Sequence, residues 1–398
     1  MRRLFSRAAM IAAASLLLAA PAAAQSCQGG KSFEAWLRDF KAQAIQSGIS
    51  PRAASAALDG LSFDRDVVRR DRAQGVFAQD FVQFSSRMVA RYRLEQGAAL
   101  IKKDAGIFRR VEQQFGVPAP VLVAFWGLET DFGANLGDSN TLRSVATLAY
   151  DCRRPDMFRT ELMSALRLVD RGDLSPQEMR GPWAGELGQF QFLPSHYLNY
   201  GVDFDGDGHI NLIRSDADAL ASAANYLTSL GWRRGEPWLQ EVRVPGNLPW
   251  QEADLAIQHP RSYWVNLGVK PTGKADLPAD NLPASLLLPM GKDGPAFLAY
   301  PNFQVYLKWN QSLVYSTTAA YFATRLAGAP PLDPGTARHL SVAQVKTLQQ
   351  ELARRGHDVG KIDGVIGEGT RAAVKQEQIR LGLPADSYPK AELLQQLR

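Results

Sequence analysis

The chain has 398 residues, of which 45% are hydrophobic and 21% charged. This balance excludes intrinsically disordered and collagen-like proteins, and the length predicts two or three domains. Lys and Arg total 45 against 40 Asp and Glu, a net charge of +5, but no dense basic run with interleaved aromatic residues occurs. Nucleic-acid binding is therefore not expected.

The N-terminus has the pattern of an export signal. Three arginines precede the apolar run from Ala8 to Leu18, and Ala22 to Ala24 offers a cleavage site before Gln25. We predict a signal peptide over residues 1–25 and a periplasmic mature protein that is soluble. A membrane anchor is the alternative, although the run is short for a span of about 20 residues. Lipoprotein anchoring through Cys27 is disfavoured because no Leu stands three residues before it.

The chain contains 2 cysteines, Cys27 and Cys152. Because an exported protein meets an oxidising compartment, we predict a disulfide between them. The alternatives are two unpaired thiols or a reactive Cys152.

Helical spacing of apolar residues runs from Ser32 to about Gly231 and contains one candidate catalytic segment. Pro118 and Pro120 mark the start of a short apolar helix, and Gly133 is expected to end it, which places Glu129 in its last turn. Burial and the negative end of the helix dipole would both raise the pKa of Glu129. Such a carboxylic acid can protonate a glycosidic oxygen. The alternative is a surface glutamate on a core helix.

A loop with the pattern of the start of an EF-hand follows. Its oxygen ligands would be the carboxylates of Asp203, Asp205 and Asp207 and the carbonyl of His209. Arg214 occupies the twelfth position, which is normally Glu, so Asp218 is predicted to supply the last carboxylate. We expect a structural Ca²⁺ and no required cofactor. The alternative is an Asx-rich turn that binds nothing tightly.

The composition of the sequence then changes twice. Prolines and glycines become frequent over residues 237–300, where Glu241–Val244 and Ser285–Pro289 are typical of strands or irregular loops, and a helical pattern returns over residues 312–326. Residues 328–338 have the composition of a linker. Residues 339–398 should form a small helical domain, with Ser341 and Gln344 as a capping box for its first helix.

Four ordered motifs resemble one family. Phe125–Gly133 is similar to the pattern W-G-x-E-[ST]-x-[FY]-G, which carries the catalytic glutamate of the membrane-bound lytic murein transglycosylase B family. The other motifs are Arg143–Asp151, Trp183–Ser195, and Trp309-Asn310 with Tyr315. Together they extend the resemblance from about Phe33 to Arg325.

The resemblance implies an α+β, mainly α fold, with a lysozyme-like catalytic domain over residues 32–327 that carries the strand-containing insertion. It implies cleavage of peptidoglycan between N-acetylmuramic acid and N-acetylglucosamine without water, which leaves a 1,6-anhydro sugar. Glu129 would act first as acid and then as base. The substrate-binding residues implied are Gln191, Phe192, Trp309, Asn310 and Tyr315. Pro182 departs from the family, which commonly has Ser there, so one polar contact is in question.

Residues Val345–Gly382 resemble the helical peptidoglycan-binding module through the run D-G-x-x-G-x-x-T-R-x-A-V. Glu377 stands where that module usually has an aromatic residue. We expect a monomer whose partner is the glycan strand, and the positive charge would suit the carboxylates of the cell wall unless it only aids solubility. Two alternatives stay open. One is a hydrolytic muramidase with Asp131, Asp138 or Glu186 as second carboxylate, although these are taken as solvated or structural; the other is a non-catalytic scaffold.

Overall fold

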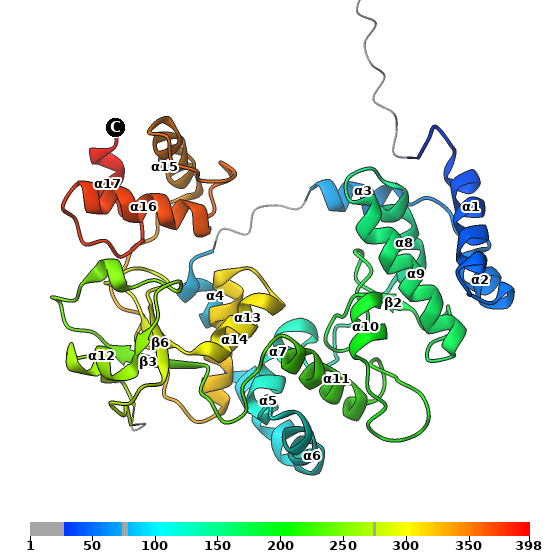
Figure 1. Ribbon diagram of the computed structural model, residues 1–398, viewed down its shortest axis with the longest axis horizontal. Helices are drawn as coiled ribbons and strands as arrows, with labels where there is room; N and C mark the ends of the chain where they lie inside the picture. Colours follow the sequence, from blue (N-terminus) through cyan, green and yellow to red (C-terminus); the bar gives the residue numbers. More distant parts are fainter. Residues whose placement is uncertain (1–27, 74–78, 274–275) are drawn as a thin grey trace, which may run out of the picture.

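The computed structural model describes residues 28–73, 79–273 and 276–398. It is mainly helical, with one small antiparallel sheet between the helical body and a helical C-terminal module (Figure 1). The predicted signal peptide and Cys27 lie outside the described residues. None of the described helices is both long and apolar enough to cross a bilayer.

The N-terminal helices begin at residues that sequence chemistry favours. The side chain of Ser32 caps the first helix, and Ser50 followed by Pro51 starts the second. Trp36 and Phe40 of the first helix are buried with their rings stacked 5.5 Å apart. The elements of this part are α1 (Phe33–Gln46), α2 (Pro51–Leu58), α3 (Arg65–Arg72), α4 (Phe81–Met88), α5 (Arg91–Lys103) and α6 (Ala105–Phe115).

Helix α7 (Ala119–Thr130) lies in the centre of the helical body. Nine of its residues are buried, because helices α5, α6, α11 and α14 all pack against it. A helix covered on all sides needs apolar residues around its whole circumference, and α7 has them. The remaining helices of the body are α8 (Thr141–Tyr150), α9 (Pro155–Arg171), α10 (Pro194–Tyr200), α11 (Asp216–Ser229), α13 (Pro301–Trp309) and α14 (Leu313–Leu326). A short two-stranded ribbon joins β1 (Ser139–Asn140) to β2 (Arg180–Gly181).

The insertion forms a five-stranded antiparallel sheet in the order β4-β6-β7-β3-β5. Both predicted strand segments contribute to it, since Glu241 pairs with Phe297 and Leu286 pairs with Leu298. A separate apolar cluster around the fully buried Trp264 fills it. Its elements are β3 (Leu239–Arg243), the 3-10 turn η1 (Trp250–Glu252), β4 (His259–Pro260), α12 (Arg261–Asn266), β5 (Lys270–Pro271), β6 (Pro283–Leu287) and β7 (Ala296–Ala299).

The C-terminal module contains α15 (Val342–Arg354), α16 (Glu368–Arg380) and α17 (Ala391–Gln396) around its own apolar core. The capping box of Ser341 and Gln344 is present. The second helix begins at Glu368, with Gly367 as its N-cap. Residues 328–338 form neither helix nor strand, but they are bonded to the insertion. The backbone N–H of Asp333 donates to the Glu241 side chain at 3.0 Å, and the backbone N–H of Thr336 donates to the Asp293 carbonyl at 2.8 Å.

The module docks on the insertion through charged groups. Arg371 is half-buried and donates to the carbonyl oxygens of Leu288 (2.9 Å) and Pro289 (3.4 Å). Lys375 pairs with Asp254 at 2.7 Å. Arg371, which stands in the motif that resembles a wall-binding module, therefore serves here to hold that module against the sheet.

Candidate active site

The end of α7 is a tight, irregular turn. Gly133 was expected to end the helix, but the chain leaves it earlier, through Asp131 (φ 53) and Phe132 (φ 61), two non-glycine residues in the left-handed region. Such residues are rare and cluster at functional sites. The turn is held from outside because Arg93 donates to the carboxylate of Asp131 at 2.8 Å and the Thr130 hydroxyl donates to the Gln189 carbonyl at 2.7 Å. This fixes the backbone directly after Glu129.

Glu129 is half-buried in the last turn of α7, as predicted, and one of its oxygens carries two hydrogen bonds. The indole N–H of Trp309 donates to Oε1 at 3.0 Å, and the Tyr315 hydroxyl donates to the same oxygen. Burial raises the pKa of Glu129, while the two donors act in the opposite direction and the nearby charge of Glu186 adds to the increase. The net result is a carboxyl group that holds its proton more strongly than an exposed glutamate.

A cavity of about 460 Å³ lies over Glu129. Aromatic rings form much of its wall: Trp309 lies 5.7 Å from Phe192 and 5.3 Å from Tyr226, measured between ring centroids. Rings of this kind pack against the faces of sugars, and the polar groups among them can fix a ligand's orientation. The lining residues are Glu129, Pro182, Trp183, Ala184, Glu186, Phe190, Gln191, Phe192, Leu193, His196, Tyr226, Trp309 and Asn310.

The two amides of the cavity wall have defined orientations. Gln191 Nε2 donates to the Gly188 carbonyl at 3.0 Å, so its Oε1 remains as an acceptor. Asn310 Oδ1 accepts the backbone N–H of Ser312 at 2.9 Å, so its amide nitrogen remains as a donor. Gln191 itself has φ 53, a left-handed conformation held by the pairing of Leu187 with Phe192. The wall thus offers one amide acceptor and one amide donor.

The predicted site residues gather around one centre. Gln191, Phe192, Trp309 and Asn310 line the cavity with Glu129, and Tyr315 contacts Glu129 from α14. Pro182 also lines the cavity and supplies no side-chain donor there. The motifs gave no role to His196 on α10 or Tyr226 on α11, because nothing in their local sequence marks them as cavity residues.

The three residues considered as a second catalytic carboxylate have different surroundings. Asp131 is engaged by Arg93 and Tyr92, and Asp138 is exposed. Glu186 was taken as solvated or structural; it is half-buried and lines the cavity with Glu129, so it is not freely solvated. Its Oε2 is buried without a hydrogen-bond partner among the described residues.

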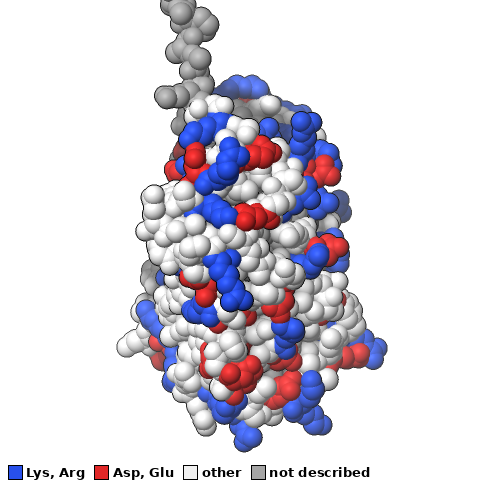
Figure 2. Space-filling view, turned by 90° about the vertical axis from the view of Figure 1, so that its right-hand side faces the viewer, with Lys and Arg blue, Asp and Glu red and all other residues white. Residues whose placement is uncertain are grey.

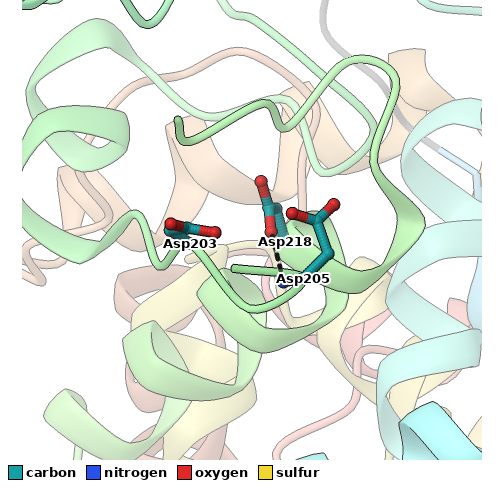
Figure 3. A group of neighbouring side chains, drawn as sticks. All are labelled: Asp203, Asp205 and Asp218. Carbon is teal, nitrogen blue, oxygen red and sulfur yellow. Dashed lines mark hydrogen bonds between the residues drawn. The ribbon is translucent and has the colours of Figure 1, made fainter. Parts of the chain in front are cut away.

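The EF-hand-like loop brings three carboxylates together. Oxygens of Asp203, Asp205 and Asp218 lie within 4.8 Å of one another, and Figure 3 shows the three side chains converging. Asp218 comes from α11 and replaces the missing last ligand as predicted, while Arg214 pairs with Glu178. Burial raises the pKa of Asp218, and the charge of Asp205 adds to the increase. Three hard oxygens with a desolvated member fit a Ca²⁺ ion.

Two other residues predicted as metal ligands, Asp207 and His209, are not among these three carboxylates. The carboxylate of Asp207 lies outside this group and accepts the backbone N–H of His209 at 2.8 Å. Asp207 is therefore a turn residue here, in the manner of an Asx turn. The carbonyl of His209 stays a predicted ligand.

The predicted disulfide cannot be followed to both ends, because Cys27 lies outside the described residues. Gln28, the first described residue, donates to the Tyr150 carbonyl at 2.8 Å, which places Gln28 beside the end of α8, close in sequence to Cys152. The bridge remains a prediction.

Charge is mixed on the surface. On the face drawn in Figure 2, Lys and Arg alternate with Asp and Glu and form no single basic area. The net positive charge is therefore not concentrated in a basic patch on this face. The cavity remains the candidate site for ligand binding.

A helical body that holds a carboxylic acid of raised pKa in an aromatic cavity is typical of lysozyme-like, glycan-cleaving proteins. Comparison with known proteins gives the family. A transglycosylase SLT domain model matches residues 32–324, and a putative peptidoglycan binding domain model matches residues 341–397. The chain belongs to the transglycosylase SLT domain family.

Individual relatives agree with this assignment. The chain is 29% identical over 238 residues to membrane-bound lytic murein transglycosylase B of Escherichia coli strain K12, and the match covers 59% of this chain and 64% of the relative, less than two thirds of its length. The structure of SltB3 from Pseudomonas aeruginosa in complex with NAG-anhNAM-pentapeptide matches with a TM-score of 0.85 and 39% identity, over 93% of this chain and all (100%) of that one. The Escherichia coli lytic transglycosylase Slt35 in complex with calcium matches with a TM-score of 0.62 and 26% identity, over 73% of this chain and 92% of that one.

Proposed function

We propose that this protein is a lytic murein transglycosylase that cleaves the bond between N-acetylmuramic acid and N-acetylglucosamine with Glu129 as its only acid and base. The observation that carries the proposal is the position of Glu129, a carboxyl group with a raised pKa at the floor of a sugar-sized cavity. The family membership and the peptide-bearing saccharide in the SltB3 structure support the same substrate class.

The hydrogen bonds of Glu129 define which oxygen reacts. Tyr315 and Trp309 both donate to Oε1, so the proton belongs on Oε2. Oε2 gives this proton to the glycosidic oxygen as the C1–O bond breaks, and the charge that develops on the carboxylate is stabilised by the two donors on Oε1. The C6 hydroxyl oxygen of the same muramic sugar then bonds to C1, and its proton returns to Glu129. Atoms balance without water, and the product is the 1,6-anhydro sugar.

The two oriented amides suit the N-acetyl group of the muramic sugar. The Asn310 amide nitrogen can donate to the acetamide oxygen, and Gln191 Oε1 can accept the acetamide N–H. Both groups stand on backbone that is fixed before substrate arrives, which favours a defined acetamide position near C1. The rings of Phe192 and Trp309 pack against the sugar.

The C-terminal module would hold the enzyme on its polymer. A second wall-binding unit raises the local concentration of glycan strands at the cavity. A cell-wall substrate and the N-terminal export pattern together support action in the periplasm. A Ca²⁺ ion held by Asp203, Asp205 and Asp218 would tie the loop before α11 to that helix, with a structural and not a catalytic role.

Product analysis tests the proposal. Purified murein sacculi are digested and the fragments are identified by mass spectrometry. We expect 1,6-anhydromuramoyl ends, and Glu129→Gln should lower the rate at least about 100-fold because acid–base catalysis is lost. Glu112→Gln, an exposed glutamate on α6, is the matched control and should keep the rate. Undiminished turnover by Glu129→Gln would refute the assignment.

A hydrolytic muramidase is the second candidate, and one observation favours it: Glu186 shares the cavity with Glu129. Most glycosidases use such a pair of carboxyl groups. Reducing muramic ends in place of anhydro ends would identify hydrolysis, and an absence of any product from the wild-type protein would point to a scaffold.

A further inference from the structure

Glu186 is placed in the cavity by a backbone that cannot easily move. A Cβ atom on Gly181 would lie 1.9 Å from the carbonyl oxygen of Glu186, and one on Gly185 would lie 2.3 Å from Cγ2 of Val145. Only glycine allows these two approaches, so the turn from Pro182 to Glu186 is clamped against β2 and α8. The next residue, Leu187, pairs with Phe192. The side chain of Glu186 therefore starts from a rigid point, as groups that bind ligands generally do.

The carboxyl group itself is unusual for the fold. Its Oε2 is fully shielded yet has no hydrogen-bond partner among the described residues. Arg154 is the cation whose charge acts on it; its Nη2 donates to Asp71, while its Nε is also buried without a hydrogen-bond partner among the described residues. A buried carboxylate oxygen without a donor lowers the stability of the folded state, so its presence calls for an explanation, and a functional role is one. Burial raises the pKa of Glu186, as expected for a desolvated acid.

The cavity shows what kind of donor is missing. Its polar lining offers the Asn310 amide nitrogen as a donor to a ligand, while Gln191 Oε1 and Glu186 are acceptors. N-acetylated sugars carry both hydroxyl and amide N–H donors, and each needs an acceptor when it leaves water. We propose that Glu186 binds substrate directly, accepting a hydrogen bond from a hydroxyl or amide N–H of an N-acetylhexosamine in the cavity.

This inference rests on the proposed saccharide substrate but not on how the bond is cleaved. Glu186 is a specificity-determining residue in it, since it touches the sugar and transfers no proton. A sugar derivative without the donor would leave the Glu186 carboxyl group without this hydrogen bond in the complex, and sites built around such bonds reject analogues that lack the group.

Binding to an uncleaved ligand separates this role from catalysis. The dissociation constant of chitopentaose, a pentamer of N-acetylglucosamine, is measured by calorimetry for the full-length Glu129→Gln protein with and without Glu186→Ala. We expect Glu186→Ala to weaken binding about 10-fold or more, as for loss of a hydrogen bond to a charged group. Glu186→Gln, which keeps an acceptor but no charge, should weaken binding less. Asp138→Asn, an exposed carboxylate nearby, is the control and should bind as the parent does.

Thermal unfolding supplies the second readout. Because the unpartnered carboxylate destabilises the free protein, Glu186→Ala should have the same Tm or a higher one. Residues kept for their function commonly reduce stability in this way. A lower Tm with an unchanged dissociation constant would show a structural role and overturn the proposal. If the wild-type protein releases reducing ends or no product while Glu186→Ala still weakens chitopentaose binding, the proposed reaction fails and the binding role of Glu186 stands.

Discussion

Replacing Tyr315 with Phe tests how the enzyme stabilises the charge on its acid. The Tyr315 hydroxyl donates to Glu129 Oε1 and acts to lower the pKa of that carboxyl group. Without it the ionised form of Glu129 loses one of two donors, so the pKa rises further and the transition state for proton transfer is less stable. A hydrogen bond to a charged group contributes about 1.5–3 kcal/mol, which corresponds to a fall in kcat of about 10- to 100-fold.

The direction of the pH effect follows from the same contact. Activity requires protonated Glu129, so it declines as pH rises through the pKa of that group. Because Tyr315→Phe raises this pKa, the alkaline limb of the pH–rate profile should move to higher pH while kcat falls. The assay is release of soluble muropeptides from labelled sacculi across a pH series, with initial rates at saturating substrate.

Tyr306→Phe is a matched control for this measurement. Tyr306 is also a buried tyrosine, with its ring stacked 4.9 Å from Phe125, and its hydroxyl has no hydrogen-bond partner within the described part of the chain. Its removal should leave kcat and the pH profile unchanged. If Tyr315→Phe behaved like Tyr306→Phe, or if its alkaline limb moved to lower pH, the role given to Tyr315 would be wrong.

The other predictions concern stability. Burial raises the pKa of Glu129 in the folded protein, so ionising this group destabilises the fold, and the loss of stability develops as pH rises above the ordinary glutamate pKa of about 4.3. Glu129→Gln should therefore have a higher Tm than wild type at neutral pH. An equal Tm would contradict the burial argument. Added Ca²⁺ should raise the Tm of the wild-type protein, and Asp205→Asn should abolish that increase whereas Asp207→Asn, outside the carboxylate group, should keep it; equal responses of the two variants would remove Asp205 from the site. Arg371→Ala should lower stability by about 3 kcal/mol because two buried carbonyl groups lose their donor, and it should expose the linker to limited proteolysis. Arg354→Ala, which removes an exposed arginine while the buried Glu351 keeps its pair with Arg355, should have little effect on either readout.

Local patterns in the sequence determined much of this protein. Prolines at the start of α7 and an unbroken apolar composition placed Glu129 in the last turn of a buried helix, because those signals act within one turn of chain. The spacing of aspartates identified the loop before α11, and Ser341 with Gln344 identified the start of α15. Each of these features depends on residues that are neighbours in the chain, so their meaning does not require the fold.

Only the tertiary structure decided which distant groups meet. Glu129 and Tyr315 are 186 positions apart, and their hydrogen bond exists because α14 packs on α7. The buried, unpartnered state of Glu186 depends on contacts from Gly181 and Val145, which no local pattern encodes. The same holds for Asp207. Its spacing in the sequence is that of a metal ligand, but its side chain accepts the backbone N–H of His209. Side-chain direction and burial are set by packing between elements, and sequence spacing alone does not contain that information.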